Sequence, residues 1–202
     1  MQQPSHEEAT AFWENEIQPH VSQLMTGKYS LRPVQERYTL NANRIVQRYS
    51  QSYLVQPYNT AIQLAGKQVE YNPIACKIEN GKPLVAVFIQ AFMAGMNKLR
   101  SLTQDPHLIN ATFEAVVVIG MMHEMEHLAN GWIGADLDYE KMIEFERLAH
   151  GETCEHTLEH FATTRKPVLE SQVKLYQKWV ACGRSADHPE WIAEIRRMYR
   201  QA

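Results

Sequence analysis

The stretch that decides the fold runs from Ala115 to His127 and reads Ala-Val-Val-Val-Ile-Gly-Met-Met-His-Glu-Met-Glu-His. The residues from Phe113 to Met122 are apolar enough to form a buried helix. We expect this helix to begin near Asn110 and to end at Asn130-Gly131, a favourable pair for a helix C-terminus. Ionisable side chains at the end of a buried helix are costly unless they are paired or bind a metal. The stretch therefore predicts a central helix that ends in a polar site.

Two histidines in this stretch have the spacing of metal ligands. His123 and His127 are four residues apart, so they share one helix face with Cβ atoms roughly 5–6 Å apart. Glu124 lies beside them, within reach of a water molecule bound to the same metal. With 9 histidines in 202 residues, about 0.04 such patterns are expected by chance. We therefore predict a zinc site here; the remaining charge of the motif, on Glu126, could face solvent.

The pattern resembles the HExxH zinc site of metallopeptidases, in which one helical turn supplies two ligands and a general base. The longer metzincin pattern is absent, because Asn130 and Ile133 stand where it has glycine and histidine. The chain looks instead like a gluzincin, a member of the thermolysin-like zinc peptidases. That resemblance implies a zincin-like fold, in which the active-site helix is crossed by a second helix that donates a glutamate ligand.

The segment from Tyr139 to Glu152 offers three glutamates for this role. Glu146 is the preferred ligand, because His150 follows four residues later, where the family often has a residue that orients a zinc-bound histidine. Glu152, followed by His156, is the alternative. Glu144 is the third candidate, but Leu148 at its fourth position cannot orient a ligand.

The resemblance also implies the chemistry. Zinc would activate a water molecule, and Glu124 would act as the general base in cleavage of a peptide bond, so the expected partner is a peptide or protein substrate. Gluzincins usually add a tyrosine or histidine donor at the oxyanion. Candidates for that donor are Tyr139, His156, His160 and Tyr176. Besides His150, Asp136 and Asp138 could accept a hydrogen bond from a zinc-bound histidine.

Composition limits the alternatives. The length fits one domain, residues 1–202. The net charge of −3 gives no electrostatic footprint for nucleic acid. The three cysteines form no CxxC motif, the first residues lack the features of a signal peptide, and the apolar runs look too short or too interrupted to span a bilayer. These features favour a cytoplasmic protein that binds no membrane.

The rest of the chain reads as mainly helical with a small β element, which gives an α+β class. A capping box at Ser5 and Glu8 opens the first helix, which Pro19 disturbs. Pro83–Leu102 fits a buried helix, although its first half could instead be a strand paired across a turn at Asn80-Gly81. Further helical patterns cover 32–56, 138–164, 167–181 and the residues after Asp187, and 68–71 alternates like a short strand.

Two other functions fit parts of the pattern. Glu124 to His127 is also an E-x-x-H unit, the ligand unit of helical di-iron carboxylate proteins, but the chain has no second unit of this kind. A non-catalytic zinc-binding protein that keeps the fold is the other alternative. Such a protein would be expected to lose Glu124 or a ligand, whereas all three motif residues are present.

Overall fold

The computed structural model describes residues 4–59, 62–64, 67–69, 73–133, 139–164, 169–184 and 193. The helical elements are α1 (His6–Phe12), the π-helical turn η1 (Trp13–Ile17), α2 (Gln18–Met25), α3 (Arg32–Tyr49), α4 (Ile89–Leu102), α5 (Pro106–Asn130), α6 (Tyr139–Thr164) and α7 (Glu170–Arg184). The strands are β1 (Leu54–Tyr58), β2 (Ile62–Leu64), β3 (Lys67–Val69), β4 (Ile74–Glu79) and β5 (Lys82–Phe88). The α+β class with a predominance of helix is confirmed.

The N-terminal helices form as the sequence predicts. The amide of Glu8 donates to Ser5 Oγ and the amide of Ser5 donates to the Glu8 carboxylate, which completes the capping box. The helix widens into the π-helical turn η1 immediately before Pro19, whose ring cannot donate a helical hydrogen bond. Val21 and Leu24 of α2 then enter the core.

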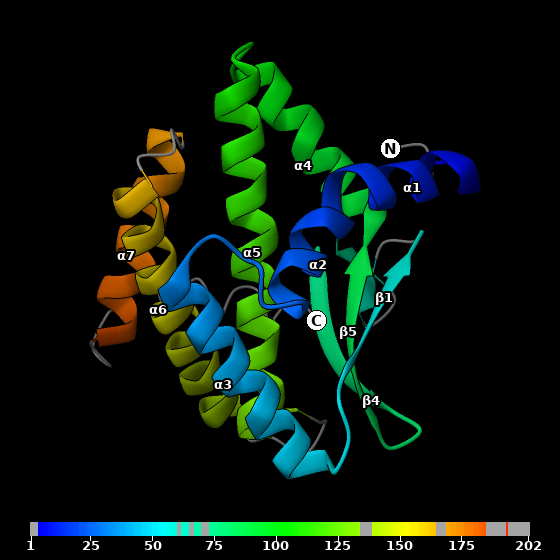
Figure 1. Ribbon diagram of the computed structural model, residues 1–202, viewed down its shortest axis with the longest axis vertical. Helices are drawn as coiled ribbons and strands as arrows, with labels where there is room; N and C mark the ends of the chain where they lie inside the picture. The colour runs from blue at the N-terminus through cyan, green and yellow to red at the C-terminus, as the bar shows by residue number, and fades with distance from the viewer. Residues whose placement is uncertain are drawn as a thin grey trace.

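A three-stranded sheet in the order β1-β5-β4 lies on one side of α5 (Figure 1). β5 is the central strand: it pairs in parallel with β1 and antiparallel with β4. Asn80 and Gly81 both have positive φ, which closes a tight hairpin between β4 and β5. β4 is therefore an edge strand of this sheet, and it is also the strand that packs on α5.

The preferred helix over Pro83–Leu102 is wrong in its first half. Lys82–Phe88 is strand β5, as in the alternative reading, and the helix begins only at Ile89. Apolar residues with both spacings run through this segment, so periodicity alone cannot separate the two structures. The deciding interaction is non-local, because Leu84 lies opposite Leu54 of β1.

α5 forms the centre of the molecule and contacts α2, α3, α4, α6, β4 and β5. It begins at Pro106, one turn earlier than expected, because the Asp105 carboxylate accepts hydrogen bonds from the amides of His107 and Leu108. It ends as predicted, with Gly131 at positive φ. Most residues of its second half are buried.

By length and composition alone, α5 could also cross a membrane, although the apolar runs of the sequence look too short or too interrupted to do so. In this structure 67% of its most apolar window is buried inside the protein. That burial is typical of the core helix of a globular protein.

α6 and α7 lie together on the side of α5 opposite the sheet (Figure 1). Their bounds agree with the predicted helices over 138–164 and 167–181 to within a few residues. α3 contacts both α5 and α6. The predicted helix after Asp187, the aspartates Asp136 and Asp138, and residues 70–72 lie outside the described residues.

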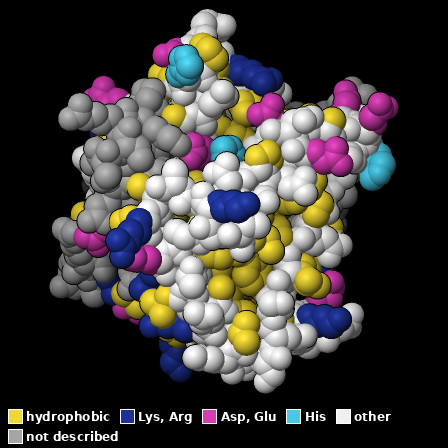
Figure 2. Space-filling model, viewed as in Figure 1, with side chains coloured by type: hydrophobic (Ala, Val, Ile, Leu, Met, Phe, Trp, Pro, Cys, Tyr) yellow, Lys and Arg dark blue, Asp and Glu magenta, His cyan; other side chains and the backbone are white. Residues whose placement is uncertain are grey.

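The face shown in Figure 2 carries hydrophobic side chains gathered between α3 and the strands, with acidic and basic side chains mixed around its margin. This mixture contrasts with the interior, where charged groups gather at the end of α5.

Gly120 sets the distance between α5 and β4. A Cβ atom at this position would lie 2.8 Å from Ile74 Cδ1 and 3.3 Å from Ile74 Cγ1, and Ile74 is only 1% exposed. Gly120→Val should therefore lower the free energy of unfolding by about 1–3 kcal/mol, because the core cannot take the added methyl groups without a shift. Denaturant unfolding followed by circular dichroism measures this change.

Gly95 of α4 provides the matched control. A Cβ atom there would meet nothing within 4 Å. Gly95→Val should change stability by about 0.5 kcal/mol or less. Equal losses in the two variants would show that α5 and β4 are not in close contact at Gly120.

Candidate metal centre

The last two turns of α5 present the histidine pair to the interior. His123 and His127 are 7% and 6% exposed, and their Nε2 atoms are 3.0 Å apart. The rings meet edge to face, with centroids 4.6 Å apart. The four-residue spacing thus brings two ring nitrogens to one point, as the sequence predicts for this pair.

α6 brings a carboxylate to the same point. Glu146 Oε2 lies 3.1 Å from His123 Nε2, and Glu146 Oε1 lies 3.4 Å from His127 Nε2. The Glu146 side chain is only 16% exposed, so it does not belong to the solvated face of the helix. Of the three glutamates considered from the sequence, Glu146 is the one that the structure places against both histidines among the described side chains.

The spacing of these three donors fits a metal. Two ligands at zinc's usual bond length of roughly 2.0–2.1 Å in a tetrahedral site lie about 3.3 Å apart. The observed separations of 3.0, 3.1 and 3.4 Å are close to this value. The residues present therefore fit a bound metal ion.

His150 contributes a third imidazole. Its Nε2 lies 3.5 Å from Glu146 Oε2, and its ring lies against that of His123 with centroids 3.9 Å apart. Ligand atoms of His123, Glu146 and His150 all lie within 4.8 Å of one another. His150 can therefore serve as a further ligand or as a group that orients Glu146.

We predicted that His150 could accept a hydrogen bond from a zinc-bound histidine. It accepts none from His123. The Nδ1 atom of His123 is buried and has no hydrogen-bond partner among the described residues. His150 contacts the ring of His123 instead.

Two groups of the cluster, Glu146 and His150, are held in the charge state that suits metal binding. Burial would lower the pKa of His127, but the hydrogen bond to Glu146 and the charge of Glu146 outweigh burial and raise that pKa. Burial would raise the pKa of Glu146, but the charge on His123 and hydrogen bonds from the three histidines hold it well below its usual range. Burial and the neighbouring charge of His123 lower the pKa of His150 to about 3. A metal ligand must be deprotonated, and both groups are held in that state.

Glu124 lies next to the histidines but points to the sheet. Its Oε2 accepts a hydrogen bond of 2.9 Å from the backbone amide of Cys76, on the edge strand β4. Burial raises the pKa of the Glu124 carboxyl, although the charges of His123 and His127 act in the opposite direction. No pattern in the sequence indicates Cys76 as a neighbour of Glu124. Burial and the Glu124 and Glu146 carboxylates raise the pKa of the Cys76 thiol well above the usual value.

Glu126 does not face solvent, and that prediction is wrong. It is 3% exposed and accepts hydrogen bonds of 2.7 Å from Arg37 Nε and Asn41 Nδ2, both on α3. Asn130 donates to its other oxygen at 3.2 Å. Burial of this charge is offset by Arg37, which the sequence could not assign as its partner.

Two of the other candidates, Glu144 and Tyr176, lie away from the cluster. Glu144 has a 46% exposed side chain that pairs with Arg147, so it points away from the cluster. Tyr176 is buried in a separate hydrophobic cluster with Ala115 and Cys154, two turns before the histidine pair. The side chains of Glu152, Tyr139, His156 and His160 lie outside the described ones.

Comparisons of this chain with protein-family models, with curated proteins and with solved structures found no match.

Glu146→Ala should weaken zinc binding by about tenfold or more, because only the imidazoles would remain to hold the metal. Zinc affinity measured by competition with a chromogenic chelator tests this. Glu144→Ala is the matched control on the same helix and should bind zinc as the wild type does. Equal affinity in the wild type and in Glu146→Ala would remove Glu146 from the site.

Proposed function

We propose that this protein is a zinc-dependent hydrolase, a peptidase of the gluzincin-like kind. The observation that carries the proposal is the position of the Glu146 carboxylate, from a second helix, against the two imidazoles of His123-Glu124-Met125-Glu126-His127. This convergence of a motif helix and a crossing helix is what the resemblance implies for a zincin-like fold.

Imidazole nitrogen and carboxylate oxygen are donors that zinc accepts together. His123, His127 and Glu146 would hold the ion. When bound, zinc would supply a Lewis acid that acidifies a water molecule and polarises a carbonyl group. The donors are buried, which strengthens their electrostatic interactions relative to water.

In this proposal Glu124 moves the proton. It is not among the converging donors, and its carboxylate is held by the amide of Cys76. Burial raises its pKa, which makes the carboxylate a better proton acceptor near neutral pH. In the proposed reaction it takes a proton from the attacking water and passes it to the leaving amine nitrogen.

The open edge of β4 supports a peptide substrate. In an antiparallel pair, alternate residues direct their amides and carbonyls to the partner strand, and those between direct them outward. The Cys76 amide bonds Glu124 and so points away from β5. No strand in the described part of the chain covers this edge. The Cys76 amide itself is occupied by Glu124, so an extended peptide would pair with the rest of this edge of β4, beside the cluster.

A non-catalytic zinc-binding protein is the second candidate, and the position of His150 favours it. If His150 binds the ion together with His123, His127 and Glu146, four protein ligands close the site and leave no position for water. The di-iron reading has less support, because it requires a second E-x-x-H unit that the sequence lacks.

Glu124→Gln should retain zinc and lose peptide hydrolysis by roughly 10²–10⁴-fold, because an amide of the same shape cannot accept the proton. The assay is cleavage of an unfolded protein substrate, with zinc content measured by elemental analysis. Glu79→Gln, an exposed carboxylate on the same strand as Cys76, is the control and should be as active as the wild type.

Two results would contradict the proposal in different ways. Full activity in Glu124→Gln would exclude Glu124 as the base. A wild-type protein that binds zinc, cleaves nothing and shows no change in the visible spectrum of its cobalt form on addition of a hydroxamate would have the closed site of the second candidate.

A further inference from the structure

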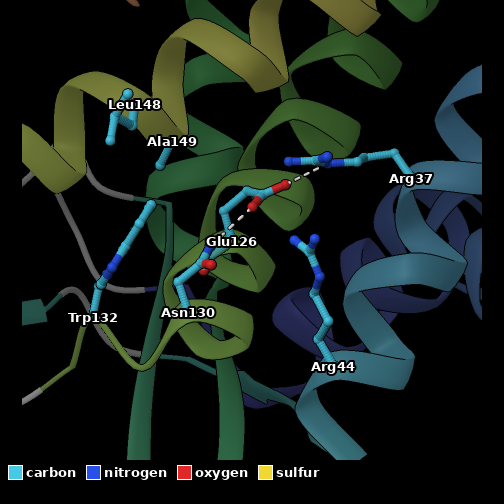
Figure 3. Close-up of a pocket in the computed structure, with 7 residues that line it drawn as sticks. All are labelled: Arg37, Arg44, Glu126, Asn130, Trp132, Leu148 and Ala149. Carbon is cyan, nitrogen blue, oxygen red and sulfur yellow. Dashed lines mark hydrogen bonds and ion pairs between the residues drawn. The ribbon is translucent and has the colours of Figure 1, made fainter.

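A second site lies on the neighbouring face of the same helical turn. A cavity of about 240 Å³, open to solvent on one side, lies between α3, α5 and α6, with Arg37, Arg44, Glu126 and Trp132 in its wall (Figure 3). Glu126 and His127 are consecutive, so their side chains leave α5 about 100° apart. The cavity thus lies on a different face from the metal cluster, although both are built on the end of α5 and Trp132 of the cavity wall meets the ring of His127 edge to face, with centroids 6.0 Å apart.

The wall of this cavity carries more positive than negative charge. Arg37 and Arg44 are seven residues apart, two turns of α3, and Figure 3 shows both guanidinium ends directed toward Glu126 and Asn130. Both guanidinium groups are permanently charged, whereas Glu126 is the one acid among the described residues of the lining.

The charge of Glu126 is already matched. Its Oε1 accepts from Arg37 and Asn41, and its Oε2 accepts from Asn130. Arg44 has no ion pair or hydrogen bond in the part of the chain that the structure describes. A half-buried guanidinium that lines a cavity and has no partner among the described residues provides a cation for an anion that those residues do not supply.

The opposite side of the cavity is apolar. Leu148 and Ala149 of α6 and the indole of Trp132 line it, and Figure 3 shows them facing the arginines across the cavity. Trp132 is fixed in place, since it stacks on Phe145 with ring centroids 4.5 Å apart. At about 30 Å³ for each water molecule, the cavity has the volume of roughly eight waters. It can take a small organic molecule as well as a simple ion.

We propose that this cavity is a binding site for a small organic oxyanion, a carboxylate or a phosphate monoester with an apolar body. Arg44 binds the oxyanion, since the planar guanidinium matches both groups with two parallel hydrogen bonds. Trp132 and Leu148 contact the apolar body. The site does not depend on the metal or on the proposed hydrolase.

Isothermal titration of the zinc-loaded protein with benzoate, phenyl phosphate and inorganic phosphate tests the proposal. Binding of at least one probe is expected. The comparison of benzoate with phenyl phosphate shows whether the site prefers a carboxylate or a phosphate monoester. Phenyl phosphate should bind more tightly than inorganic phosphate, because only the former has an apolar body.

Arg44→Gln should weaken binding of the preferred probe by about tenfold or more, because a charged hydrogen bond is lost. The affinity of Arg44→Lys for this probe should lie between those of the wild type and Arg44→Gln, because lysine keeps the charge but cannot form the two parallel hydrogen bonds. Arg32→Gln removes an exposed arginine of the same helix and should bind as the wild type does. Circular dichroism establishes that each variant is folded. Binding of none of the probes to the wild type, or equal binding to Arg44→Gln and wild type, would overturn the proposal.

Discussion

The contact of the Glu146 carboxylate with two imidazoles of a single helical turn is the interaction on which this structure depends. It joins α6 to the end of α5, at the place where a buried apolar helix becomes a run of ionisable residues. Two buried imidazoles with converging nitrogens require a cation or a proton between them, and a carboxylate at the same point favours either one. The crossing of α5 by α6 thus determines the fold in this region and creates the candidate site.

Each ionisable residue of the motif is stabilised by a different neighbour of α5. The histidines contact Glu146 of α6, Glu124 accepts from the Cys76 amide of β4, and Glu126 pairs with Arg37 of α3. The polar end of α5 therefore fixes three separate elements around itself, while the apolar half holds the core. Paired buried charges are costly to break, because removal of one partner leaves the other desolvated. A metal at the histidines would add a further cross-link between α5 and α6.

The sequence predicted those features that depend on local patterns. The apolar run and Asn130-Gly131 defined α5 and its end, whereas the expectation that Glu146 lies opposite the histidine pair came from the resemblance to gluzincins. Non-local features could not be read in the same way. β5 became a strand because Leu84 pairs with Leu54, and Glu126 is buried because Arg37, 89 positions earlier, reaches it. The contact of Glu124 with Cys76 spans 48 positions and left no pattern in the sequence.

Zinc K-edge X-ray absorption of the protein loaded with one equivalent of zinc tests the central claim most directly. The claim is that His123, His127 and Glu146 hold one metal ion. The account predicts a shell of nitrogen and oxygen at roughly 2.0–2.1 Å, with the outer scattering of at least two imidazole rings. A sulfur shell at about 2.3 Å would make a cysteine a ligand and contradict the account. A shell of oxygen alone, without imidazole scattering, would place the metal elsewhere on the protein.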